Sequence, residues 1–235
     1  MRWPRYGYRR ILAQLAREGV VAGERVVRRL LKALGGSHQA GRIRVRTTDS
    51  NHAHQRYPNL LKRMAITHPD QAWVADITYI RFGRRFIYLA VILDAYTRAV
   101  RGWALSRNID QRLTTAALQM ALVQSRPLIF HSDQGRQYAA SDHTELLLST
   151  GALISMADAG QPTQNALVER FIRTFKEEHL DFADYDSFDD AITQIQHWLE
   201  TTYNTERIHS ALDYLTPNEF ERACIQRQPS LSFYT

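Results

Sequence analysis

The chain has 235 residues, of which 44% are hydrophobic and 10% aromatic, enough for one sizeable core and a small second domain. It contains no apolar run as long as the roughly 18 residues of a membrane span, and its start leads straight into a helical pattern rather than an export signal. A single cysteine excludes an internal disulfide and a multi-cysteine zinc cage. We therefore expect a soluble cytoplasmic protein in which any metal is held by oxygen or imidazole.

The net charge of +6 is unevenly distributed along the chain. Residues 1–60 contain thirteen lysines and arginines against three acids, a local charge of +10, whereas residues 61–235 carry −4. A basic segment attached to a mildly acidic domain is typical of an arm that binds a polyanion. Nucleic acid is the expected partner, and a membrane surface is the weaker alternative.

Two short helices are expected in the front segment, residues 1–36. Apolar residues repeat at helical spacing over 8–15 and again over 26–34, with Gly19 between the two stretches. One face of the second helix carries four cations, Arg25, Arg28, Arg29 and Lys32. The pattern predicts a helix-turn-helix that contacts DNA, and the alternative is a basic surface without a ligand. Residues 37–70 show no sustained period and are expected to be a linker.

The pattern changes to β-strands from residue 71. Three segments rich in β-branched and aromatic residues, joined by short connections, predict antiparallel neighbours at 73–80, 86–93 and 99–105. A helix, a strand, a helix and a strand are then expected at 113–123, 128–131, 143–149 and 152–155. Three strands followed by this alternation predict an α/β fold, a mixed five-stranded sheet with helices on its faces.

Helices dominate the remainder of the chain. A polar loop precedes an expected helix at 164–176, a second helix is expected at 188–203, and Thr216-Pro217-Asn218-Glu219 has the pattern of a capping box that starts a third. We assign residues 71–182 to a core domain and 183–235 to a helical extension of it.

Three acidic residues are candidates for a metal-binding catalytic site. Asp76 lies inside an otherwise apolar strand, Asp133 follows a short buried strand, and Glu169 lies on the exposed side of the 164–176 helix. A carboxylate in an apolar strand is unfavourable unless it is paired or bound to a cation. Three such carboxylates at one site would repel each other unless Mg²⁺ or Mn²⁺, here two ions, neutralised them. Each acid alone also has an ordinary explanation: a paired core Asp, a turn residue and a surface Glu.

A resemblance to a known family rests on three blocks, 73–80 around Asp76, 131–138 around Asp133 and 165–176 around Glu169. They resemble the Asp-Asp-Glu core of transposases and retroviral integrases, and are most similar to the integrase-like subunit of the insertion-sequence-three family of bacterial transposases. The 35 residues between Asp133 and Glu169 and the lysine seven positions after Glu169 belong to this pattern. The tail from Tyr203 to Leu212 and the Tyr6-Gly7-Tyr8 segment extend it over nearly the whole chain.

The resemblance implies a ribonuclease-H-like fold, with Asp76, Asp133 and Glu169 as catalytic metal ligands. It implies Mg²⁺-dependent cleavage at the ends of a mobile element and joining of the freed 3′-hydroxyl to target DNA. Lys176 and Asn165, and with them Arg173, share the helical side of Glu169 and are expected to contact double-stranded DNA. The implied partners are further copies of the chain and a first-frame transposase subunit, with no membrane, at the bacterial nucleoid.

Two features depart from relatives of this kind. Gln164 stands where the family often has Asp, and one cysteine cannot build the His-His-Cys-Cys zinc domain of retroviral integrases. Two other functions remain open on the residues: a ribonuclease-H-like nuclease, and a catalytically silent DNA-binding regulator of transposition.

Overall fold

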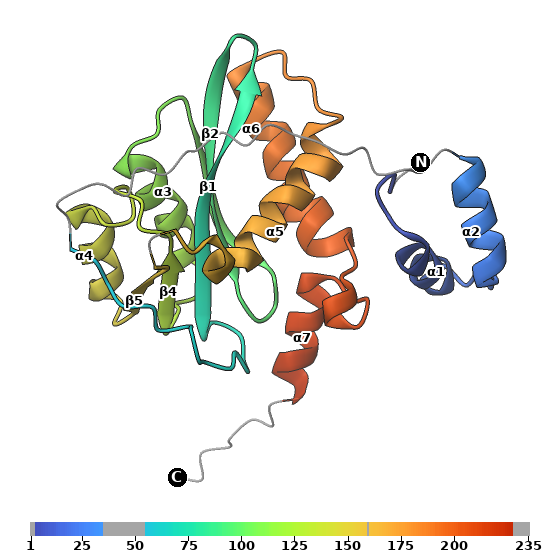
Figure 1. Cartoon of the computed structure of the whole chain (residues 1–235), viewed down its shortest axis with the longest axis horizontal. Coiled ribbons are helices and arrows are strands. Elements are labelled where there is room, and N and C mark those ends of the chain that lie inside the picture. Colours follow the sequence, from blue (N-terminus) through green and yellow to red (C-terminus); the bar gives the residue numbers. More distant parts are fainter. Residues whose placement is uncertain (1–2, 35–54, 159, 228–235) are drawn as a thin grey trace.

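The computed structural model describes residues 3–34, 55–158 and 160–227, and a five-stranded mixed sheet forms its centre (Figure 1). The strands are β1 (Ala72–Phe82), β2 (Arg85–Asp94), β3 (Val100–Ser106), β4 (Ile129–Ser132) and β5 (Leu153–Met156), in the spatial order β3-β2-β1-β4-β5. The first three are antiparallel neighbours, while β4 runs parallel to β1 and β5 parallel to β4. The predicted mixed sheet is confirmed.

Helices cover both faces of the sheet. The first face carries α3 (Gln111–Leu122) and α4 (Ser141–Ser149), and the second carries α5 (Ala166–Phe175) and α6 (Phe188–Gln196) (Figure 1). A hydrophobic core lies on each face of the sheet, and successive side chains of β1 pack alternately into the two. Val74 and Ile80 lie on the α5 side, and Trp73 and Ile77 on the α3 side. This alternation decides which residues of β1 can reach the α5 helix.

The helices after the sheet are longer than their spacing predicts. The α5 helix continues as η2 (Lys176–Leu180), a π-helical turn, and α6 continues as the π-helical η3 (His197–Glu206). A change to the wider π pattern leaves no sign in apolar spacing, and such turns are frequent at functional sites. After η4 (Ser210–Leu212), α7 (Pro217–Arg227) begins with the expected capping box: Thr216 N donates to Glu219 Oε2 at 2.9 Å and Glu219 N donates to Thr216 Oγ1 at 3.2 Å.

The front segment forms α1 (Tyr8–Arg17) and α2 (Glu24–Ala33), joined through Gly19 at a positive φ of 76°. Tyr6, just before α1, is buried, and its hydroxyl accepts a hydrogen bond of 3.1 Å from Ile208 N. The front helices are therefore docked on the C-terminal part of the core.

Residues 55–70 of the expected linker form neither helix nor strand, and positions 35–54 lie outside the described residues. Within the described part of the chain, no helix has the length and apolar character needed to cross a membrane.

Candidate active site

Asp76 and Asp133 are placed by two parallel neighbouring strands. Val74 on β1 is paired with His131 on β4, and Asp76 and Asp133 each follow two residues later, Asp76 within β1 and Asp133 just past the end of β4. Neighbouring strands lie about 4.8 Å apart, which brings the two carboxyl groups together on the side that α5 covers.

The electrostatics of Asp76 reflect this proximity. Burial, and after it the charge of Asp133, raises the pKa of Asp76 to about 8, with a smaller contribution from Glu169. A hydrogen bond of 2.7 Å from Ile77 N and the nearby Lys176 act in the opposite direction. An ionised Asp76 is therefore costly here unless a cation joins the two aspartates.

Gly135 controls the position of the Asp133 carboxylate. Asp133 Oδ1 accepts a 2.9 Å hydrogen bond from Gly135 N, which closes a tight turn after β4. A Cβ atom at position 135 would lie 2.9 Å from that same oxygen. Only glycine therefore leaves the carboxylate where it is.

Glu169 projects from the first turn of α5, whose opposite side buries Val168, Phe171 and Phe175 in the core. Glu169 is exposed, and the described residues contain no group of three acids, histidines or cysteines close enough to hold a metal ion. The donor set nevertheless fits a hard divalent cation, because Asp76 and Asp133 are adjacent carboxylates that disfavour each other's charge. Glu169 would complete the set by turning toward them.

The three residues expected to contact DNA lie in different environments. Lys176 Nζ lies 4.6 Å from the centroid of the Tyr79 ring, and Arg173 is exposed. Asn165 is only 5% exposed, and its Nδ2 donates a 3.0 Å hydrogen bond to the carbonyl oxygen of Ala75. The expectation that Asn165 lies on the exposed side with Glu169 is wrong, because the residue belongs to the 3-10 turn η1 (Pro162–Asn165) and not to the α-helix. Its contact with DNA stays a prediction.

Two residues near the acids have environments that the sequence did not signal. The Tyr138 hydroxyl is buried without a hydrogen-bond partner among the described residues, and burial, then Asp76 and Asp133, raises the pKa of Tyr138. Its only sequence signal is membership of the block that contains Asp133. Gln164 Oε1 accepts hydrogen bonds of 2.7 Å from both Asn59 Nδ2 and Asp158 N. Gln164 Nε2 donates to Asp158 Oδ2 at 2.9 Å, a bond that an Asp at position 164 could not donate.

All four predicted cations of α2 are exposed, namely Arg25, Arg28, Arg29 and Lys32. Arg28 is paired with Glu24 at 2.7 Å and its guanidinium lies 4.0 Å from the centroid of the Tyr8 ring. The basic face of α2 is thus available at the surface, as a contact with DNA phosphates requires.

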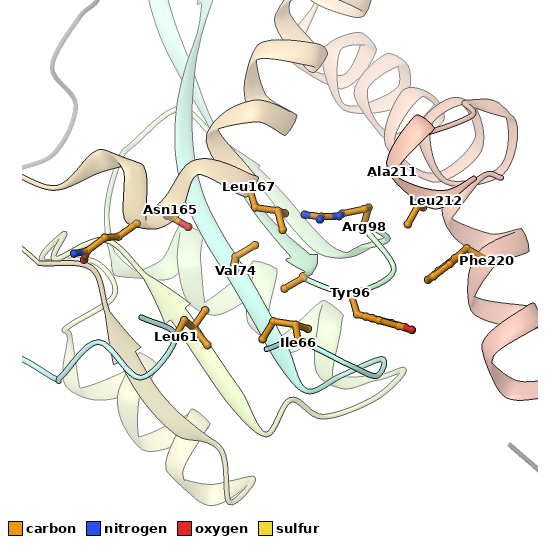
Figure 2. Close-up of a pocket in the computed structure, with 12 residues that line it drawn as sticks. Leu61, Ile66, Val74, Tyr96, Arg98, Asn165, Leu167, Ala211, Leu212 and Phe220 are labelled. Carbon is orange, nitrogen blue, oxygen red and sulfur yellow. The ribbon is translucent and has the colours of Figure 1, made fainter. Parts of the chain in front are cut away.

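A cavity of about 380 Å³ lies behind the start of α5 (Figure 2). Its walls are mostly apolar and include Val74 and Leu167. The polar lining residues include Arg98, Gln164 and Asn165. None of the three acids is among its lining residues, so this cavity is separate from the acidic group.

Family comparisons agree along the chain. Residues 66–162 and residues 150–217 each match a model described as integrase core domain, and residues 1–36 match an HTH-like domain.

Proteins of bacterial insertion elements match almost all of the chain. The transposase of insertion sequence element IS904 from Lactococcus lactis is 33% identical over 222 residues, 93% of this chain and 88% of the relative. A 31 kDa protein of insertion element IS600 from Shigella sonnei is 38% identical over 219 residues, 92% of this chain and 80% of that protein. The transposase InsF of IS3A from Escherichia coli is 32% identical and covers 92% and 77%, respectively.

Solved structures share the fold at lower identity. The catalytic core domain of HTLV-2 integrase in complex with magnesium has a TM-score of 0.51 and 18% identity, covering 66% of this chain and 97% of that one. A chain of the simian T-cell lymphotropic virus intasome has a TM-score of 0.58 and 16% identity, covering 96% of this chain and 76% of its own. Both likenesses concern the fold, and the ribonuclease-H-like arrangement is thereby confirmed.

Proposed function

The chain belongs to the insertion-sequence-three family of transposases with an integrase core, and on this premise we propose that it cuts DNA at the ends of an insertion element and joins the freed 3′-hydroxyls to target DNA. We assign the chemistry to Asp76, Asp133 and Glu169. The observation that supports this assignment best is the proximity of Asp76, on β1, to Asp133, just after the parallel neighbour β4, with the pKa of Asp76 raised to about 8.

The three carboxylates would hold Mg²⁺ or Mn²⁺, the ions that suit an all-oxygen set of donors. The HTLV-2 integrase core was solved with magnesium, which supports the same choice here. When bound, two such ions activate the attacking hydroxyl or water and stabilise the leaving oxygen of a phosphodiester. The carboxyl groups contribute position and charge, and Gly135 keeps the Asp133 carboxylate in its place.

The basic residues beside the acids would orient the DNA. Lys176 lies close enough to Asp76 to lower its pKa, so a phosphate bound by Lys176 would lie next to the reacting group. Arg173, exposed on the same helix, can contact the same DNA strand. Arg25, Arg28, Arg29 and Lys32 would hold duplex further away.

The partners follow from this reaction. Both ends of an element must be brought together with target DNA, so we propose that several copies of the chain assemble on DNA, as in the intasome that shares the fold. A first-frame transposase subunit is a further proposed partner, and bacterial chromosomal DNA in the cytoplasm the proposed site of action.

The test is strand joining by the purified protein on oligonucleotides that carry the element ends, with Mg²⁺ or with EDTA. Glu169→Gln and Asp76→Asn are expected to lower the rate roughly a thousandfold, the several kcal/mol that metal-assisted charge stabilisation supplies. Glu145→Gln, an exposed acid of α4 on the opposite face of the sheet, is the matched control and should leave the rate unchanged.

Full activity of Glu169→Gln would remove Glu169 from the assignment. Cleavage of an RNA–DNA hybrid without strand joining would indicate a nuclease. DNA binding without either reaction would indicate a silent regulator.

A further inference from the structure

The β1–β2 hairpin extends beyond the rest of the sheet as a two-stranded arm. β1 pairs with β4 only over residues 72–74, and β2 pairs with β3 only as far as Tyr88. From the pair Ile80–Ile87 to the pair Phe82–Arg85 at the turn, β1 and β2 pair only with each other among the strands of the sheet. Figure 1 shows this hairpin rising past the sheet beside α6. The arm can therefore present side chains to a partner that lies across the end of the sheet.

One side of the arm is fixed to the protein. Ile80 and Ile87, directly opposite each other, are 2% and 1% exposed and belong to the core on the α5 side. Phe82 packs against the same core, and the guanidinium of Arg107 lies 4.4 Å from the Phe188 ring centroid and 5.9 Å from that of Phe82. This packing holds the arm in place before any ligand binds.

The other side and the tip are basic and aromatic. Arg81, Arg84 and Arg85 are exposed, and the sequence from residue 77 to 93 contains no acid. Phe86, paired with Arg81 across the hairpin, is 46% exposed, and its ring meets that of Tyr79 edge to face at 5.4 Å. Three exposed arginines without a neighbouring acid in the hairpin form a surface for phosphate groups.

Two acids lie in a groove on one side of the arm. A groove of about 490 Å³ separates the arm from residues 180–185 and is lined by Lys176, Arg81, Asp181 and Asp184. Asp181 is paired with Arg5 at 3.2 Å, and Asp184 is exposed. The carboxylates disfavour a polyanion inside the groove, so the favourable approach is from outside it. From there the DNA reaches the exposed Arg81 over the outer side, and Arg84 and Arg85, which do not line the groove, at the tip.

The arm also begins at the candidate active site. Tyr79, three residues after Asp76 on β1, lies under Lys176 Nζ at 4.6 Å. At about 3.3 Å per residue, Arg81 lies roughly 17 Å from Asp76 along the strand, and the turn lies roughly 20–23 Å away. Base pairs stack about 3.4 Å apart, so these distances correspond to about five to seven base pairs.

We propose that the outer side and tip of this arm, Arg81, Arg84 and Arg85, are a second DNA-contact surface that holds the backbone of duplex DNA about five to seven base pairs from the reacting phosphate. The proposal rests on the proposed function for the location of that phosphate. The phosphate contacts themselves depend only on the charge and shape of the arm.

The experiment measures DNA binding by the full chain to a 25-base-pair duplex at a series of salt concentrations, without Mg²⁺. Each phosphate contact contributes about 0.9 to the slope of log affinity against log salt. Arg84→Ala/Arg85→Ala is expected to lower the slope by about 2 and the affinity about tenfold near 0.15 M salt. Arg84→Lys/Arg85→Lys, which keeps both charges, should retain the slope.

Arg126→Ala/Arg222→Ala is the matched control, because it removes two exposed arginines from the loop before β4 and from α7. Equal slopes for the arm and control variants would overturn the proposal. The proposal would also be overturned if Arg84→Ala/Arg85→Ala lost as much affinity on a duplex that extends fewer than about five base pairs beyond the reacting phosphate. Strand joining with Mg²⁺ is measured separately, so an inactive wild-type chain would count against the proposed reaction while the slopes still decide the role of the arm.

Discussion

Asp76 destabilises the metal-free fold at neutral pH. Its carboxyl group is partly buried beside Asp133, and these two effects raise its pKa from an ordinary 3.8 to about 8. Between these two pH values the folded chain holds a proton that the unfolded chain has released. The free energy of unfolding therefore falls as the pH rises from about 4 to about 8. A residue that lowers stability and still stands in the middle of a core strand is typical of a functional site.

Asp76→Asn should remove this pH dependence, because the amide cannot ionise. In EDTA, the variant is expected to be more stable than the wild type at pH 8, by on the order of 1–3 kcal/mol, with a smaller advantage at pH 5. Urea unfolding at both pH values measures the difference. Glu145→Gln should follow the wild type at both pH values, and parallel behaviour of Asp76→Asn and wild type would contradict the role given to Asp76.

At the scale of helices and strands, the features that depend on neighbouring residues in the sequence were predictable. Contacts between residues far apart in the chain were not. The strand β1 and the capping box at Thr216 depend on neighbouring residues, so the sequence predicted both. Asp76 stood out because a carboxylate in an apolar strand needs a cation. The burial of Asn165 was missed, since its partner, the carbonyl of Ala75, lies 90 positions away in the chain.

The protruding arm was missed for a related reason. Composition predicted both strands of the hairpin, but not that β3 and β4 would stop pairing with them before the turn. How far a strand extends past its neighbours depends on register, which local patterns do not fix. The sequence analysis therefore did not single out the exposed arginines of the turn.

The η2 turn is tied to the C-terminal segment by a buried ion pair. Arg207 is 2% exposed, and its Nε and Nη2 donate 2.7 Å hydrogen bonds to the two carboxylate oxygens of Glu178. Lys176 begins the same turn, so this pair fixes the element that carries Lys176. A buried charge that loses its partner is far more costly than an exposed one.

Glu178→Gln is expected to lower the free energy of unfolding by about 3 kcal/mol, because Arg207 would remain buried without a counter-charge. Glu24→Gln breaks the exposed Arg28–Glu24 pair, which has a similar distance of 2.7 Å, and should change stability by less than about 0.5 kcal/mol. Denaturant unfolding of both variants at pH 7 makes the comparison. Losses of similar size would show that the Arg207 pair is no stronger than a surface contact.

In the whole molecule, the cations of the front segment are divided between two tasks. Arg5, Arg10 and Arg17 face the core, paired with Asp181 at 3.2 Å, Glu178 at 3.9 Å and Glu219 at 2.6 Å, respectively. The cations of α2 are exposed, and with the arm and Lys176 they give the molecule three basic surfaces. The first set holds the front helices on the core, and the second set is the one that we expect to bind DNA.

This division predicts opposite behaviour for two multiple variants. Replacing Arg25, Arg28, Arg29 and Lys32 by Ala should lower the salt slope of DNA binding by about 3 to 4, since each lost phosphate contact removes about 0.9. Replacing Arg5, Arg10 and Arg17 by Ala should leave the slope nearly unchanged and loosen the front helices, which limited proteolysis would detect as faster cleavage within residues 3–34. If the second variant instead lowered the slope as much as the first, the ion pairs with Asp181, Glu178 and Glu219 would have to open when DNA binds, and the docked front segment would be a DNA-free state of the protein.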